Sequence, residues 1–154
     1  MTPEVQITCD GSCLGNGQMV VTRAACAALM TDTVHWRAVG SFLGSITNQQ
    51  AEIAAAALAL EALKFPSRVT VRSDSAYLVR TMRGEYGRRA NHDYWRRLDL
   101  AAGRHEVTWL WVRGHSGDPV QTLCDRAARS IAAAPSAADS TLQMILRAAR
   151  RLPR

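Results

Sequence analysis

The stretch VQITCDGSCLGNG, residues 5–17, contains the first strong structural signal of the chain. Apolar and polar residues alternate from Val5 to Cys9, which predicts a half-buried strand. We expect this strand to end at Asp10, where a glycine-bearing turn begins. The turn is not a P-loop, because no Gly-Lys-Ser/Thr follows it. Asp10 is therefore a candidate ligand or catalytic group if other carboxylates reach the same place.

The sequence after this strand contains both strand patterns and helix patterns. Alternating or continuous apolar runs predict strands, and the alanine- and leucine-rich run NQQAEIAAAALALEALK predicts a helix capped by Thr47 or Asn48. This order predicts an α/β fold with an antiparallel first half and crossover connections behind it. Strands are expected at 4–9, 19–30, 33–43, 68–74 and 106–112, and helices at 48–64, 75–84, 93–103 and 119–134.

The composition limits the class of protein. A chain of 154 residues suits one domain, and its formal charge of +6 favours a polyanionic partner, either nucleic acid or an acidic membrane surface. The longest apolar stretch, residues 53–63, contains Glu61 and is too short to span a bilayer. The four cysteines match no zinc pattern, and no signal peptide is evident. We expect reduced cysteines and a soluble, cytoplasmic, monomeric protein without membrane contact.

The C-terminal part differs in composition from the rest. The stretch AAAPSAADS, residues 132–140, has the composition of a linker, and the residues after it could form a basic amphipathic helix. We expect a domain of residues 1–134 and a basic tail of residues 135–154. The tail could pack on the domain with a solvated basic face, bind nucleic acid, or lie on a membrane surface.

Four carboxylates fall at positions that suggest a shared site. Asp10 and Asp74 each follow a predicted strand, and the carboxyl ends of parallel strands commonly carry a site. Glu52 lies in the first turns of the alanine-rich helix, where a solvent-facing glutamate is the alternative. Asp125 lies in the last helix, where it could instead pair with Arg129. If the four carboxylates converge, their mutual repulsion favours divalent cations such as Mg²⁺.

The chain resembles type 1 ribonuclease H in four ordered blocks. These are TCDGSCLGN, ITNQQAEIAAAALAL, VRSDSAYLV and WLWVRGHSGDPVQTLCDRAA, and they span about residues 4–134. The resemblance implies a five-stranded mixed sheet flanked by helices. It also implies an endonuclease that cleaves the RNA strand of RNA/DNA hybrids with two Mg²⁺ ions, or Mn²⁺ as a substitute, and leaves 3′-hydroxyl and 5′-phosphate ends. Little sequence specificity is expected, because contacts to the backbone do not read bases.

The resemblance assigns roles to individual residues. Asp10, Glu52, Asp74 and Asp125 match the metal-binding carboxylates. His115 matches a loop histidine that assists proton transfer or product release. Residues that match substrate contacts are Cys13, Asn16, Thr47, Asn48, Gln49 and Ser75.

The chain also departs from the family pattern. The basic protrusion of many relatives is shortened here to MRGEYGRRANHDYWRRLD, and the first hairpin is expected to be trimmed. Gln121 stands where asparagine is usual. Two other functions remain open, a non-catalytic nucleic-acid-binding module and a two-metal nuclease of the resolvase or integrase type. The complete carboxylate set disfavours the first, and the TNQQAE and GHSGDP blocks disfavour the second.

Overall fold

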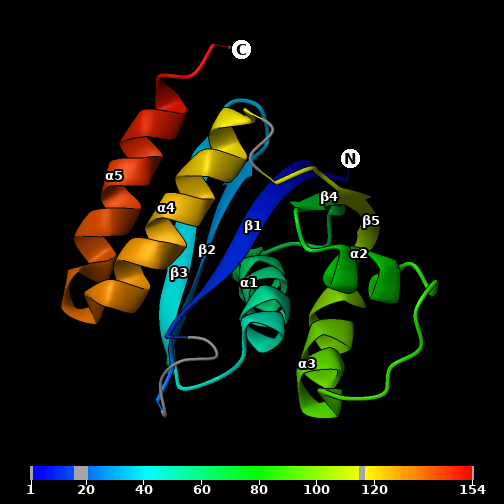
Figure 1. Cartoon of the computed structure of the whole chain (residues 1–154). Coiled ribbons are helices and arrows are strands. Elements are labelled where there is room, and N and C mark those ends of the chain that lie inside the picture. The colour runs from blue at the N-terminus through cyan, green and yellow to red at the C-terminus, as the bar shows by residue number, and fades with distance from the viewer. Residues whose placement is uncertain (1, 16–20, 115–116, 154) are drawn as a thin grey trace.

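A computed structural model of the chain describes residues 2–15, 21–114 and 117–153. These residues form a five-stranded mixed sheet with helices on both faces (Figure 1). The strand order is β3-β2-β1-β4-β5, with β1 antiparallel to β2 and parallel to β4. The strands are β1 (Glu4–Leu14), β2 (Arg23–Thr31), β3 (Trp36–Gly44), β4 (Arg68–Ser73) and β5 (Glu106–Trp111), and the α-helices are α1 (Asn48–Ala62), α2 (Ala76–Met82), α3 (His92–Ala102), α4 (Pro119–Ala133) and α5 (Ala138–Arg150). The predicted α/β class and sheet are confirmed.

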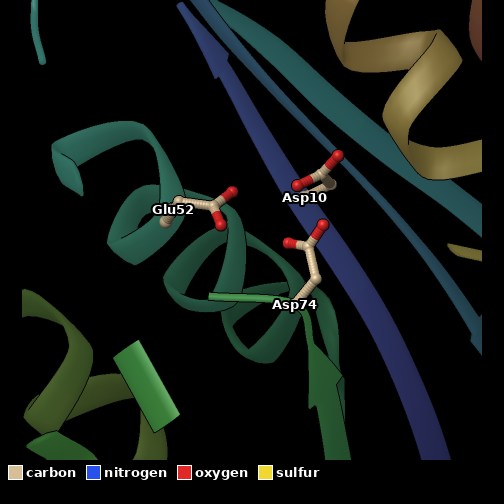
Figure 2. A group of neighbouring side chains, drawn as sticks. All are labelled: Asp10, Glu52 and Asp74. Atoms are coloured by element: carbon tan, nitrogen blue, oxygen red, sulfur yellow. The ribbon is translucent and has the colours of Figure 1, made fainter. Parts of the chain in front are cut away.

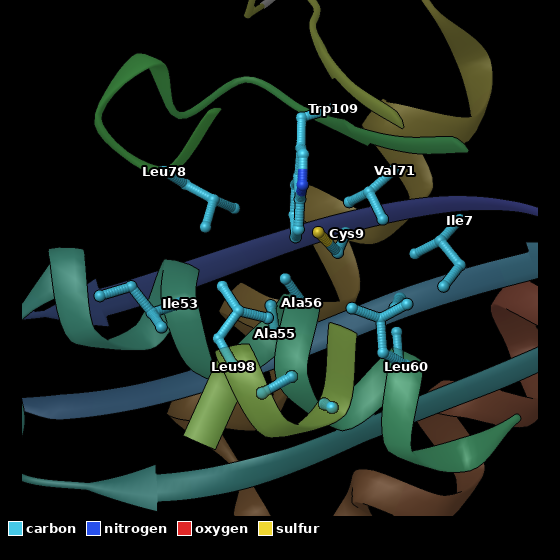
Figure 3. Close-up of a cluster of buried hydrophobic side chains, with 14 of the residues drawn as sticks. Ile7, Cys9, Ile53, Ala55, Ala56, Leu60, Val71, Leu78, Leu98 and Trp109 are labelled. Atoms are coloured by element: carbon cyan, nitrogen blue, oxygen red, sulfur yellow. The ribbon is translucent and has the colours of Figure 1, made fainter. Parts of the chain in front are cut away.

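One face of the sheet carries the larger core. Helix α1 packs on β1 and β2, and α3 packs on α1 from outside. The alanines of α1 bring the helix axis close to the sheet, so that Ile53 and Leu60 meet Ile7 and Val71 in a continuous apolar cluster (Figure 3). Trp95 of α3 is fully buried at its outer edge. This packing fixes the position of the N-terminal turn of α1 relative to β1.

The other face is covered by α4 and α5. Helix α4 lies on β1 and β2, and α5 lies on β3 and against α4 (Figure 1). Ile145 and Ala149 of α5 are buried with Leu29 and Cys124. The linker predicted at residues 132–140 is absent. The end of α4, a short 3₁₀ turn (Pro135–Ala137) and the start of α5 occupy that stretch instead, because α5 must fold back to bury its apolar stripe.

The first strand is longer than its sequence pattern predicts. β1 continues through Asp10 to Leu14, and Asp10 pairs with Ala27 while Gly11 pairs with Cys26. The expected turn therefore does not begin at Asp10. Only β2 accompanies this half of the strand, because the pairing with β4 ends at Thr8.

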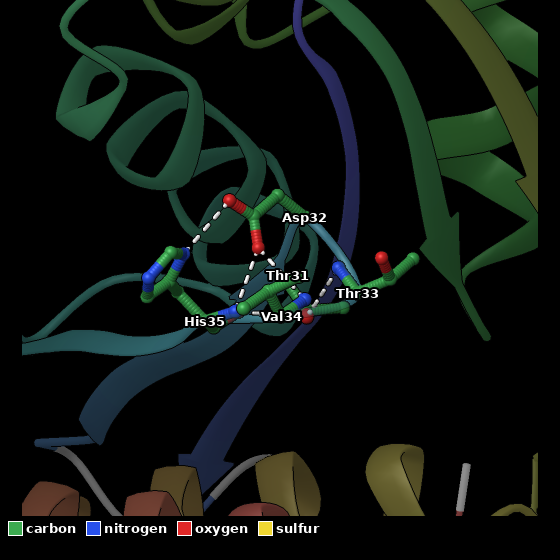
Figure 4. A network of polar contacts seen from close by, with 5 residues as sticks. All are labelled: Thr31, Asp32, Thr33, Val34 and His35. Carbon is green, nitrogen blue, oxygen red and sulfur yellow. Dashed lines mark hydrogen bonds and ion pairs between the residues drawn. The ribbon is translucent and has the colours of Figure 1, made fainter.

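The turn between β2 and β3 is closed by one carboxylate. Asp32 Oδ1 accepts from the backbone N–H groups of Val34 and His35, at 2.9 and 2.6 Å, and Oδ2 lies 3.1 Å from His35 Nδ1 (Figure 4). These hydrogen bonds, the one from the His35 N–H above all, lower the pKa of Asp32 to about 2. Thr33 adopts a positive φ of 79° beside it.

The shortened basic segment forms a loop followed by the first turns of α3. Residues 83–91 join α2 to α3 without a helix of their own. Three arginines of this segment form ion pairs within the protein, Arg88 with Asp99, Arg96 with Asp93 and Arg97 with Glu61. Among the described residues, every helix is too short or too polar to cross a bilayer.

Candidate active site

The parallel pairing of β1 and β4 brings two of the predicted carboxylates together. Thr8 of β1 is in register with Arg72 of β4. Asp10 and Asp74 each come two residues later, so they emerge side by side at the same end of the pair. Their proximity was predicted from strand ends alone, and it holds although β1 itself continues beyond Asp10.

Helix α1 delivers the third carboxylate. Thr47 and Gln50 form a reciprocal capping box, with hydrogen bonds of 3.1 and 3.0 Å, which fixes where the helix starts. Glu52 follows in the next turn and points toward β1 (Figure 2). Its Oε1 accepts a hydrogen bond from the backbone N–H of Gly11. The solvent-facing alternative for Glu52 is therefore wrong, because the side chain is 5% exposed.

Gly11 makes this approach of β1 and α1 possible. A Cβ atom at position 11 would lie 2.5 Å from the carbonyl carbon of Ala51 and 2.6 Å from the backbone nitrogen of Glu52. No side chain fits in that space, so glycine is required where the strand touches the helix. Asp10 and Glu52 thereby face each other across a contact between two backbones.

The three side chains form a compact acidic group. Asp10, Glu52 and Asp74 each offer an oxygen, and these oxygens lie within 4.8 Å of one another (Figure 2). Burial is the main cause of a raised pKa at Asp10, and the charges of Glu52 and Asp74 raise it further. Burial likewise raises the pKa of Glu52. No ion pair joins any of the three to a described cationic side chain, so the group has the character of a cation site.

Asp125 lies beside this group rather than in it. Its side chain, on α4, forms an ion pair with Arg129 one turn later, which is the alternative that the sequence left open. It nevertheless lines a polar cleft of about 240 Å³ together with Asp74, and its charge contributes to the raised pKa of Asp10. Asp125 is thus near enough to act on the cluster electrostatically. Its role as a metal ligand stays a prediction.

The predicted substrate contacts that the structure describes lie on β1, at the start of α1 and at the start of α2. Cys13 donates from Sγ to the carbonyl oxygen of Ile46, at 3.4 Å, and so joins the end of β1 to the start of α1, where Asn48 and Gln49 are exposed. Thr47 caps α1, and the Oγ of Ser75 caps α2 by accepting from Leu78 N–H at 3.1 Å. His115 and Asn16 lie outside the described residues. None of these side chains is yet tied to a substrate.

Two residues next to Asp74 were not singled out from the sequence. Trp111, at the end of β5, donates from its indole Nε1 to the main-chain carbonyl of Asp74, at 3.1 Å. Gly114 passes so close that a Cβ atom there would lie 3.3 Å from Asp74 Oδ2. The only signal for Trp111 was its place at the end of a strand beside the GHSGDP block, and its side chain is half exposed.

A partly buried charge pair links the strand before Asp74 to the helix of Asp125. Arg72 Nη2 lies 2.6 Å from Asp118 Oδ2, and Asp118 Oδ1 accepts from the N–H groups of Val120 and Gln121. Asp118 therefore caps α4 and ties it to β4 at once. An arginine within a strand, two residues before a candidate carboxylate, was the signal available in the sequence.

Asn91, at the end of the loop of residues 83–91, contacts the start of α1. It adopts a left-handed conformation with φ 62°, and its side chain accepts from Gln50 Nε2 at 3.2 Å and donates to Tyr77 Oη at 3.0 Å. Asparagine tolerates this conformation better than most residues. Its side chain is used for these contacts instead of capping α3.

Comparisons with known proteins identify the family of this chain. The sequence model of the family "RNase H" matches residues 2–133. Ribonuclease H of Proteus mirabilis is 35% identical over 153 residues, which cover 91% of this chain and 94% of that protein. The crystal structure of LC9-RNase H1, a type 1 RNase H, superposes with a TM-score of 0.74 at 25% identity and covers 86% of this chain and 74% of that one. LC11-RNase H1, solved in complex with an RNA/DNA hybrid, has a TM-score of 0.68 at 21% identity, over 82% and 97% of the two chains. The chain therefore belongs to the ribonuclease H family of hydrolases.

Proposed function

We propose that the protein is an endonuclease that hydrolyses the RNA strand of RNA/DNA hybrids with two divalent cations and little sequence specificity. The observation that carries this proposal is the convergence of Asp10, Glu52 and Asp74, largely buried and without a cationic partner among the described residues. Membership in the ribonuclease H family supports the reaction, and the hybrid bound to LC11-RNase H1 supports the substrate.

The donor set fits Mg²⁺. Three carboxylates offer hard oxygen ligands within 4.8 Å of one another, and a cation would relieve the burial and repulsion that raise the pKa values of Asp10 and Glu52. Asp125 would join as a fourth ligand after leaving Arg129. Two bound Mg²⁺ ions, or Mn²⁺ in their place, would lower the pKa of an attacking water and stabilise charge on the leaving oxygen.

The side chains of this protein supply the fixed geometry for that chemistry. The Gly11 N–H donates to the Glu52 carboxylate, Trp111 donates to the main-chain carbonyl of Asp74, and Gly114 leaves room for the Asp74 side chain. These contacts favour carboxylates that are oriented before substrate arrives. His115, which follows Gly114 in the sequence, is proposed to move a proton or assist the departure of product.

Selectivity for a hybrid is proposed to come from the loops at the ends of β1 and α1. Small polar groups there can contact 2′-hydroxyls across the wide minor groove of the hybrid. The residues proposed for these contacts are Cys13, Asn16, Thr47, Asn48 and Gln49, and Ser75 is proposed to contact the substrate from the start of α2. Because such contacts and phosphate contacts read shape and sugar rather than bases, cleavage should depend steeply on salt and weakly on sequence.

Cleavage of one labelled RNA strand tests this function. The strand is presented as RNA/DNA hybrid, as double-stranded RNA and alone, each with Mg²⁺, with Mn²⁺ and with EDTA. We expect metal-dependent cuts at many positions, confined to the hybrid. Cleavage that persists in EDTA, or that is equally fast on all three substrates, would refute the proposal.

A further inference from the structure

The arginines in the described part of the chain fall into two classes. Most are engaged within the protein, as Arg72 is with Asp118 and Arg97 with Glu61, and an engaged guanidinium has less to offer to a phosphate. A smaller set makes neither an ion pair nor a side-chain hydrogen bond with any described residue. Its members are Arg83, Arg89, Arg113, Arg126, Arg147, Arg150 and Arg151.

Two unengaged arginines line the cleft beside the acidic group. Arg113 follows β5, and Arg126 follows Asp125 on α4. Both side chains border the 240 Å³ cleft, whose wall also includes Asp74 and Asp125. Both residues are exposed. They come from separate elements and meet at one opening, as a two-sided clamp requires.

The acidic residues of the cleft do not neutralise Arg113 and Arg126. Asp118 is neutralised by Arg72, and Asp125 by Arg129. The remaining acid in the wall is Asp74, which belongs to the cation site. Once cations neutralise that site, the positive charges of Arg113 and Arg126 have no local balance, so the cleft is suited to an anion.

We propose that Arg113 and Arg126 clamp a phosphate of the cleaved strand that flanks the scissile phosphate on the α4 side. This inference rests on the proposed function. The scissile phosphate must lie at the acidic group, and Asp74 borders both that group and the cleft. The strand that reaches Asp74 therefore has a neighbouring phosphate at the cleft. Guanidinium groups match phosphate oxygens in geometry and charge, and such a contact sets register without reading sequence.

Arg129 provides an internal contrast within the same cleft. It lines the same wall but is occupied by Asp125. Its removal should free Asp125 for a cation, and so lower the Mg²⁺ concentration needed for half-maximal activity. Removal of Arg113 or Arg126 should instead weaken the hold on the strand.

The test compares Arg113→Gln, Arg126→Gln and the double variant with Arg147→Gln. Arg147 is equally exposed and unengaged, but lies on α5, over the opposite edge of the sheet from β4 and β5. Hybrid affinity is measured against salt concentration in an Asp10→Asn background, and KM and kcat are measured in the otherwise unchanged enzyme. Each cleft variant should reduce the salt slope by about 1 and raise KM about three- to tenfold, with kcat nearly unchanged.

Further variants and outcomes make the test decisive. Arg126→Lys keeps the charge and should restore most of the salt slope, and thermal melts confirm that each variant is folded. If wild type cleaves hybrids but the cleft variants behave like Arg147→Gln, the clamp is wrong and the proposed function stands. A changed Mg²⁺ requirement with an unchanged salt slope would also overturn the clamp. If wild type neither binds nor cleaves hybrid, the proposed function fails first.

Discussion

Asp10 is a buried member of the acidic group. Its side chain is 4% exposed, and it lies on a strand whose pairing with β2 continues past it. A substitution there that keeps shape and volume therefore tests charge alone. The hybrid contacts proposed for the loops do not involve the Asp10 carboxylate, so binding and catalysis should separate at this position.

Asp10→Asn should abolish Mg²⁺-dependent cleavage while hybrid binding remains. The amide loses the negative charge that a cation needs but preserves the packing against Glu52. Cleavage of a labelled hybrid and its affinity, measured on the same preparation, check both halves of this prediction. Retained cleavage would rule out Asp10 as a metal ligand.

Glu52 controls stability in the absence of metal through its raised pKa. A carboxyl group with a raised folded-state pKa favours the folded state fully below its unfolded pKa of about 4.3, and that contribution is lost as pH rises through the folded value. Burial is the main cause of the raised pKa, because it destabilises the charged form of the carboxyl group. The metal-free protein should therefore become less stable, through this residue, between mild acid and neutral pH.

Glu52→Gln should remove this pH dependence while it abolishes cleavage. In EDTA, the variant should melt at a higher temperature than wild type at pH 8, and the two melting temperatures should converge at pH 4. Glutamine still offers an oxygen to the Gly11 N–H. Mg²⁺ at pH 8 should raise the melting temperature of wild type much more than that of the variant. A lower melting temperature for the variant at pH 8 would contradict this account.

At the scale of elements, the site depends on the contact between β1 and α1. The two backbones approach closely enough at Gly11 that a methyl group would clash with Ala51 and Glu52 main-chain atoms. Main-chain atoms cannot move aside as a flexible side chain does. The contact therefore fixes the positions of two carboxylates, one from each element.

Gly11→Ala should lower the free energy of unfolding by about 1–3 kcal/mol, the usual cost of overpacking, and should reduce kcat strongly because Glu52 is displaced from Asp10. Urea denaturation and steady-state kinetics measure the two effects. Gly87→Ala is a matched control, because a Cβ atom there meets nothing within 4 Å. Equal behaviour of the two variants would show that the β1–α1 contact has more room than the structure indicates.

At the scale of the whole molecule, α5 completes the second face of the sheet. Ile145 and Ala149 are buried against Leu29 and α4 residues, while the arginines near the end of the helix are exposed. The helix therefore packs through its apolar stripe. The boundary between a catalytic domain and a tail at residue 134 stays a proposal, and the family match ends one residue earlier.

Two variants separate packing from charge in α5. Ile145→Ala should cost about 2–5 kcal/mol of stability, because it leaves a cavity between α5 and the sheet. The triple variant Arg147→Gln, Arg150→Gln and Arg151→Gln should keep the wild-type melting temperature and salt slope. A clear loss of salt slope in the triple variant would instead make α5 part of the nucleic-acid interface.

The sequence alone determined the class of fold and the composition of the acidic group. Strand and helix periods depend on local alternation, so β4, α1 and α4 begin where their patterns predict. Ordered motif blocks pointed to four carboxylates, because each block carries one at a fixed place in an element. The fold groups Asp10, Glu52 and Asp74, while Asp125 pairs with Arg129 beside them. The full length of β1 and the fate of residues 132–140 were missed, because both are set by partners distant in the chain.

Only the tertiary structure decided which charged residues are available. Arg88 and Arg97 belong to the shortened basic segment, and Asp99 and Glu61 engage them from 11 and 36 residues away. Arg113 and Arg126 were not singled out from the sequence. In the cleft beside Asp74, neither is engaged by another described residue. Ion pairing depends on distance in space rather than on sequence pattern, because any arginine can satisfy any carboxylate that the fold brings near it. The sequence therefore specified the chemistry of the site, and the fold specified which charges remain free to serve it.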